Sequence, residues 1–137
     1  SRDIWSIKAE VYLPCATQNE IDLESAKLII KNRAIAVCEG SNMSTTSDAV
    51  NYLLENHCLY LPGKASNAGG VSVSGLEIQQ NKINERWSFE QVDNKLKEIM
   101  ENIFMNIYET SAKYHKKNNF LFGANFYAYN KLLELMK

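Results

Sequence analysis

The feature that most constrains the fold is the run Ala34–Cys38, in which five consecutive side chains are apolar. A continuous apolar run of this length is typical of a parallel β-strand that is covered on both faces. Two further short runs, Glu10–Ala16 and Cys58–Leu61, have strand-like composition and stand on either side of it in the chain. Helical segments separate the three runs, and this alternation with short connections predicts an α/β fold with a doubly wound, mostly parallel sheet.

Both separating segments have the apolar spacing of amphipathic helices. Asp22 is a residue of N-cap type and predicts the start of the first helix. The second helix is expected at about Ser47–Asn56. The apolar sides of the two helices consist of Leu23, Ala26, Ile29 and Ile30 in the first and Ala49, Val50, Leu53 and Leu54 in the second.

Polar segments follow each predicted strand, namely Ala16–Glu20, Glu39–Asn42 and Ser66–Gly70. The carboxyl ends of parallel strands lie at one edge of a sheet, and α/β proteins bind their ligands at that edge. We therefore expect the three segments to converge on a ligand site.

The third polar segment leads into a helix that we expect to begin near Ala68. Asn67, Val71 and Ser74 then stand at i, i+4 and i+7, a spacing that places them on one helix face. The glycine pair Gly69–Gly70 would let another molecule approach the backbone closely. An amide, an apolar group and a hydroxyl on one face therefore predict a binding site.

Structural alternatives stand beside these assignments. Asn67 also fits a helix cap, and Ser74 also fits a small packing residue. Asn42 fits a turn residue after Gly40, and a further alternative is that the following helix is capped by Thr17 or Asn19.

After the third strand the chain becomes helical. One helix is expected to run to about Arg86, and Ser88 with Gln91 forms a capping-box pattern that starts the next. A loop at Lys116–Asn119 precedes a last helix at Ala124–Met136. Seven apolar residues of the long middle helix recur at helical spacing and are expected to face the core: Val92, Leu96, Ile99, Ile103, Phe104, Ile107 and Tyr108.

Bulk composition argues against several classes of partner. The 137 residues carry a net charge of −1 and no long basic block, so nucleic-acid binding through a basic surface has little support. No apolar run approaches the ~18 residues that span a membrane. Cys15, Cys38 and Cys58 form no Cys-x-x-Cys motif, so we predict no metal site and no disulfide framework, and we expect small buried thiols in a reducing compartment.

Four motifs, in their order and spacing, resemble the hexameric glutamate dehydrogenases: Val11–Glu20, Glu39–Met43, Pro62–Val71 and Ser74–Glu77. The resemblance identifies residues 1–86 as the second half of an NAD(P)-binding domain, a partial Rossmann-like sheet, and residues 87–137 as C-terminal helices that pack on it. The family's glycine-rich phosphate loop, its lysine-bearing stretches and its catalytic aspartate have no counterpart here. We therefore expect a fragment that holds no catalytic residue and is inactive by itself.

The resemblance also implies roles for seven residues. Val71 and Ser74 would contact the substrate side chain, with the Ser74 hydroxyl bonding the distal carboxylate of glutamate. The cofactor-binding residues would be Ala16, Thr17 and Gln18 along the dinucleotide and Asn42 and Asn67 by its nicotinamide end.

The reaction that the resemblance implies for the full-length protein is reversible oxidative deamination of glutamate to 2-oxoglutarate and ammonia. Hydride would pass to NADP or NAD, of which NADP is favoured, and the full-length protein would be a homohexamer. A cytoplasmic location is favoured, and an organellar one stays open. Two alternatives remain: a related leucine-, valine- or phenylalanine-type dehydrogenase, which tends to have an apolar residue in place of Ser74, and a non-catalytic nucleotide-binding module.

The chain departs from the family pattern at three positions of this region. The family commonly has glycine in place of Arg33, alanine in place of Ser41 and proline in place of Ser44. We expect a different helix C-cap at Arg33. We also expect the hydroxyls of residues 44–47 to cap the second helix instead of the missing proline.

Overall fold

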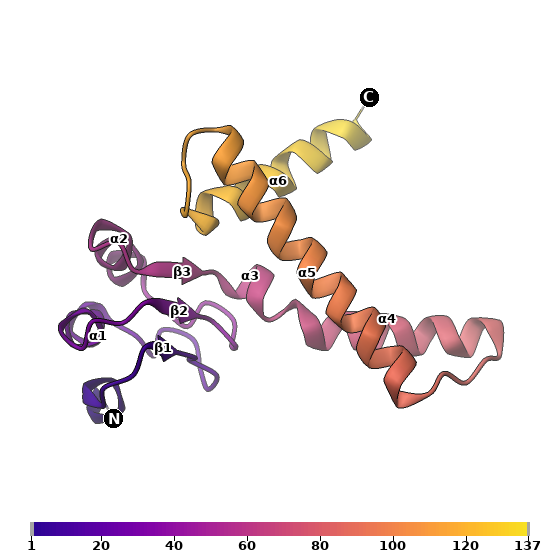
Figure 1. Ribbon diagram of the computed structural model, residues 1–137, viewed down its shortest axis with the longest axis horizontal. Coiled ribbons are helices and arrows are strands. Elements are labelled where there is room, and N and C mark those ends of the chain that lie inside the picture. The colour runs from indigo at the N-terminus through magenta and orange to yellow at the C-terminus, as the bar shows by residue number, and fades with distance from the viewer. Residues whose placement is uncertain (1, 137) are drawn as a thin grey trace.

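Three parallel strands, β1 (Val11–Tyr12), β2 (Ala36–Cys38) and β3 (Leu59–Leu61), form the sheet of the computed structural model, which describes residues 2–136. The strands lie in sequential order, and Val37 of β2 stands opposite Tyr12 on one side and Tyr60 on the other. A helix connects each strand to the next (Figure 1). The α/β fold class with a parallel sheet and C-terminal helices is therefore confirmed.

Two helices make the crossovers, α1 (Leu23–Lys31) and α2 (Ser47–Glu55), and they pack against each other. Asp22 caps α1 as predicted, because its Oδ1 accepts a 2.9 Å hydrogen bond from the Ser25 amide. A short 3₁₀ helix, η1 (Arg2–Ser6), precedes β1 and packs beside α1. The main core lies among these elements: Trp5, Tyr12, Ile21, Ala26, Ile29, Val37, Ala49, Val50, Leu53, Cys58 and Tyr60.

Four helices follow β3: α3 (Gly63–Ser66), α4 (Ala68–Ile83), α5 (Phe89–Lys113) and α6 (Phe120–Leu135). In Figure 1, α4 extends away from the sheet, α5 runs back from its outer end, and α6 crosses the C-terminal half of α5. The capping box at Ser88 is confirmed, since Ser88 Oγ accepts from the Gln91 amide and Gln91 Oε1 accepts from the Ser88 amide. Within residues 2–136, no helix combines the length and the apolar character needed to cross a membrane.

One expectation for the C-terminal helices holds only in part, and another is wrong. The apolar stripe of α5 does not face the core as a whole, because Ile107 is buried whereas Phe104 keeps 41% of its surface exposed. The reason is that α5 packs mainly on α4 and α6, and only its C-terminal half joins the apolar cluster that includes Leu59 and Leu61 of β3. The last helix also begins at Phe120, four residues early, because Asn119 caps it through a 2.9 Å bond from the Phe122 amide.

The expected pattern of buried cysteines holds only in part. Cys58 is buried, Cys38 is half-buried and Cys15 is exposed. Cys15 lies beyond the end of β1, which stops at Tyr12, so it belongs to the loop at the sheet edge. Burial is the main factor that raises the pKa of Cys58 to about 11, so this thiol stays protonated at neutral pH.

The expectation of a different C-cap for α1 is also wrong. Arg33 itself takes the left-handed conformation, with φ of 60°, that glycine favours at this position. Its amide donates to Ile30 O, and the Ala34 amide donates to Ile29 O, which together complete a Schellman motif. Arg33 therefore does not change the type of C-cap. Its own backbone takes a left-handed conformation that is disfavoured for a residue with Cβ.

Replacing Arg33 with glycine is expected to stabilise the protein by about 1 kcal/mol, because a residue with Cβ is disfavoured in the left-handed region. Thermal and urea unfolding of the full-length protein would measure the gain. Arg33→Ala is the matched control, since it removes the charge but keeps Cβ, and no gain is expected from it. An equal gain in both variants would contradict the backbone explanation.

Candidate functional site

Three loops at the carboxyl ends of the strands are hydrogen-bonded to one another. We call them edge loop 1 (Cys15–Glu20), edge loop 2 (Gly40–Thr46) and edge loop 3 (Pro62–Asn67). The Asn19 amide of edge loop 1 donates a 2.9 Å bond to the Met43 carbonyl of edge loop 2. The convergence that the sequence predicted is therefore present.

Asn42 and Asn67 join edge loops 2 and 3 directly. Asn67 Nδ2 donates a 2.7 Å hydrogen bond to Asn42 Oδ1. Asn67 is the C-cap residue of α3 and the N-cap residue of α4, so it stands at a cap position, but its side chain makes no capping bond to α4 and instead bonds Asn42. Among the described residues, Asn42 Nδ2 and Asn67 Oδ1 keep free hydrogen-bonding capacity, which suits a donor and acceptor ligand such as a carboxamide.

Edge loop 1 is shaped by Glu20, which the sequence reasoning did not single out. Glu20 Oε1 accepts from the Ala16 amide at 3.0 Å and the Thr17 amide at 3.4 Å. Ala16, Thr17 and Gln18 are exposed at the tip of this loop. Neither Thr17 nor Asn19 caps α1, since Asp22 does so, and the structural alternative for both residues is wrong.

The two serines that depart from the family pattern form a hydroxyl pair inside edge loop 2. Ser41 Oγ and Ser44 Oγ lie 2.6 Å apart, and Ser41 Oγ also donates to Thr17 O at 3.3 Å. Ser44 is fully buried and therefore packs inside the loop and does not cap α2. The N-cap residue of α2 is Thr46, which is one of the expected four, but its hydroxyl donates to Asp48 and accepts from no helix amide, so the capping expectation holds for the residue and not for the bond.

Glu39 is a second carboxylate that the sequence reasoning passed over. It directly follows β2, with only 2% of its surface exposed. Its Oε1 accepts from the Thr45 amide at 2.8 Å and its Oε2 from the Gly63 amide at 2.7 Å. Burial, reinforced by the Glu39 charge, raises the pKa of the neighbouring Tyr60. The available signal was an acidic residue directly after an apolar strand.

The first turns of α4 present Val71 and Ser74 outward. Val71 is 73% exposed and Ser74 is exposed, with its hydroxyl donating to Gly70 O at 3.3 Å. Ser74 is therefore not a packing residue. A Cβ added at Gly70 would meet nothing within 4 Å, so this glycine leaves the open surface expected of it, whereas Gly69 faces Leu96 and Met100 of α5.

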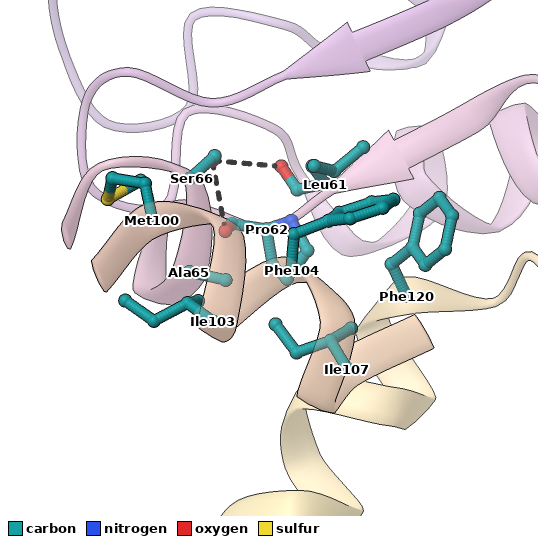
Figure 2. Close-up of a pocket in the computed structure, with 9 residues that line it drawn as sticks. All are labelled: Leu61, Pro62, Ala65, Ser66, Met100, Ile103, Phe104, Ile107 and Phe120. Carbon is teal, nitrogen blue, oxygen red and sulfur yellow. Dashed lines mark hydrogen bonds between the residues drawn. The ribbon is translucent and has the colours of Figure 1, made fainter. Parts of the chain in front are cut away.

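Two of the hollows near this edge differ in character. A groove of about 420 Å³ opens beside the asparagine pair, and its walls include Glu39, Asn42 and Lys64. An apolar cavity of about 50 Å³ lies between α3 and α5 (Figure 2). The Ser66 hydroxyl at its wall bonds the carbonyls of Leu61 and Pro62, so this second cavity offers no polar group and is a packing feature.

An open parallel sheet with polar loops meeting at its carboxyl edge is the architecture of doubly wound nucleotide-binding α/β domains. The model of one such family, Glutamate/Leucine/Phenylalanine/Valine dehydrogenase, matches residues 1–137. The chain belongs to this family.

Individual relatives agree with this membership. The NADP-specific glutamate dehydrogenase of Salmonella typhi is 43% identical over 135 residues, which cover 96% of this chain and 29% of the relative. The solved glutamate dehydrogenase of Plasmodium falciparum has a TM-score of 0.92 and 47% identity over 95% of this chain and 28% of its own. A hetero-hexameric glutamate dehydrogenase from Thermus thermophilus has a TM-score of 0.88 and 25% identity over 97% and 31%. The chain thus spans less than a third of the length of these relatives.

Proposed function

We propose that this chain is the part of a glutamate dehydrogenase that supplies the nicotinamide pocket and one substrate contact. The full-length protein would catalyse the reversible oxidative deamination of glutamate to 2-oxoglutarate and ammonia, with NADP or NAD as the hydride carrier. The observation that carries the proposal is the Asn42–Asn67 pair at the sheet edge, next to the outward face of α4. Family membership supports the same reading.

The cofactor assignment rests on groups that fit a dinucleotide. Asn42 and Asn67 together offer an amide donor and an amide acceptor, the complement of a nicotinamide carboxamide. Ala16, Thr17 and Gln18 are exposed along the neighbouring loop and would line the rest of this end. A bound dinucleotide supplies the hydride chemistry, while the residues here orient it and bring the reacting carbons close. NADP is our first choice, in line with the specificity named for the Salmonella relative.

The substrate assignment rests on Val71 and Ser74. Both are exposed on α4, at i+4 and i+7 from Asn67, and this helical spacing would place them on the face of Asn67. The Ser74 hydroxyl would donate to the distal carboxylate of glutamate, and Val71 would pack on its aliphatic carbons. The acid and base of the reaction would come from the rest of the full-length protein.

Assembly and location are proposed on more general grounds. We propose that the full-length protein is a homohexamer, and the hetero-hexameric Thermus relative supports the number of subunits in this proposal but not their identity. Three free cysteines support a reducing compartment such as the cytoplasm.

The test is an assay of the full-length protein that contains this sequence. We expect glutamate-dependent reduction of NADP, and oxidation of NADPH with 2-oxoglutarate and ammonium. We also expect the isolated 137-residue chain to be inactive. Faster turnover of leucine, valine or phenylalanine would favour the related dehydrogenases. Dinucleotide binding without turnover of any amino acid would favour the non-catalytic module.

A further inference from the structure

We propose that Glu39 is a positioning residue that holds Asn42 and Asn67 in register at the nicotinamide end of the site. This inference rests on the proposed function, because it gives the asparagine pair its purpose. Within residues 2–136, no hydrogen bond joins the Glu39 carboxylate to Asn42 or Asn67. Glu39 acts through the backbone of the two loops that carry the two asparagines.

The two carboxylate oxygens of Glu39 hold different loops. Oε1 accepts from the Thr45 amide of edge loop 2, three residues after Asn42, and Oε2 accepts from the Gly63 amide that begins α3. The single turn of α3 connects Gly63 to Asn67, because the Asn67 amide donates to Gly63 O at 2.9 Å. One side chain therefore fixes the bases of both loops, and the Asn67–Asn42 bond closes their tips.

The main chain of Glu39 reinforces the same connection. Its carbonyl accepts a 2.6 Å bond from the hydroxyl of Ser66, the residue next to Asn67. The approach of the two loops is also close, since a Cβ at Gly63 would come within 2.7 Å of Ser41 O and 3.2 Å of Glu39 Oε2. Glycine at position 63 thus allows edge loop 2 to approach α3 this closely.

A buried carboxylate at this position destabilises the fold unless it has hydrogen-bond partners. Glu39 is 2% exposed, and within residues 2–136 no basic side chain forms an ion pair with it. A buried charge costs several kcal/mol unless hydrogen bonds compensate it, and an apolar residue directly after β2 would avoid that cost. What an apolar residue could not supply is a pair of acceptors for two separate loops.

Glutamine at position 39 is the sharpest probe of this role. It is isosteric with glutamate, but its amide group would place N–H donors against the N–H of either Thr45 or Gly63, so one loop is released. The asparagine on the released loop would then no longer be held opposite the other asparagine. The expected result is weaker binding of the nicotinamide end only, since the rest of a dinucleotide lies away from the pair.

The experiment compares two ligands on the full-length protein. The dissociation constants of NADP and of 2′-phospho-ADP-ribose, which lacks nicotinamide, are measured for the unmodified protein and for Glu39→Gln. We expect about a tenfold weaker NADP affinity and less than a twofold change for 2′-phospho-ADP-ribose. Glu55→Gln, which removes an exposed carboxylate of α2, is the matched control and should change neither. Equal weakening of both ligands, or of neither, would overturn the proposal.

A double-mutant cycle tests whether Glu39 acts through the pair. Asn67→Ala should weaken the binding of NADP and leave the binding of 2′-phospho-ADP-ribose unchanged. Adding Glu39→Gln to Asn67→Ala should lower the NADP affinity little further, because the two changes remove one shared arrangement. Additive losses would overturn the positioning role while leaving the proposed function intact. An Asn67→Ala protein with unchanged NADP affinity would refute the nicotinamide assignment itself, and the role of Glu39 with it.

A milder variant keeps the test decisive if Glu39→Gln does not fold. Ser66→Ala removes only the hydroxyl that donates to Glu39 O, to Leu61 O and to Pro62 O. We expect about threefold weaker NADP binding and unchanged 2′-phospho-ADP-ribose binding from it. Loss of both affinities, or no loss at all, would again contradict the proposal.

Discussion

Replacing Gly123 with alanine is expected to destabilise the protein by about 2 to 3 kcal/mol through overpacking between α5 and α6. A Cβ at this position would be driven into the Ile107 carbonyl oxygen, within 3.0 Å of Ile107 Cγ2 and 3.1 Å of its carbonyl carbon. These neighbours include helix backbone, which cannot move aside as a flexible side chain would. Urea and thermal unfolding of the full-length protein would measure the loss.

The matched control for that change is Gly75→Ala. Gly75 lies inside α4, and a Cβ added there would meet nothing within 4 Å. Alanine favours helix over glycine by about 1 kcal/mol, so this variant should be slightly more stable. A Gly123→Ala protein as stable as the unmodified one would mean that α5 and α6 do not cross as closely as described.

The sequence was sufficient to predict the features that depend on local pattern. The strand–helix alternation follows from apolar runs and amphipathic spacing, and the caps at Asp22 and Ser88 follow from residue type and spacing. The convergence of the three edge loops also followed, because parallel strands place their carboxyl ends together. Each of these inferences needs only a short stretch of chain or a single topological rule.

The features that sequence reasoning missed depend on contacts between distant segments. Glu39 became visible as a link only when Thr45 and Gly63 were placed around it, 6 and 24 residues away in the chain. The helical spacing of α5 correctly predicted an amphipathic helix, yet it could not say that the partners of that helix cover only a part of its apolar face. The half-exposed Phe104 is the consequence.

Replacing Ser74 with valine in the full-length protein is expected to lower kcat/KM for glutamate by about 100-fold. The hydroxyl is exposed on α4, and a hydrogen bond to a charged carboxylate is worth about 1.5 to 3 kcal/mol, with more lost when an apolar group faces that charge. The KM for the dinucleotide should change less than twofold, because the predicted cofactor residues lie on the edge loops. Steady-state kinetics with both substrates varied would separate the two constants.

The control for this change lies two residues away on the same helix. Ser72 also bonds the carbonyl four residues before it, Ala68 O, but it is half-buried while Ser74 is exposed. Ser72→Ala should therefore leave both kinetic constants nearly unchanged. If Ser74→Val kept its activity on glutamate, the hydroxyl would not meet the distal carboxylate, and the choice of glutamate over apolar amino acids would have to come from elsewhere. A gain in turnover of leucine or valine by the same variant would instead assign substrate choice to this position, because the apolar side chain would then meet an apolar group.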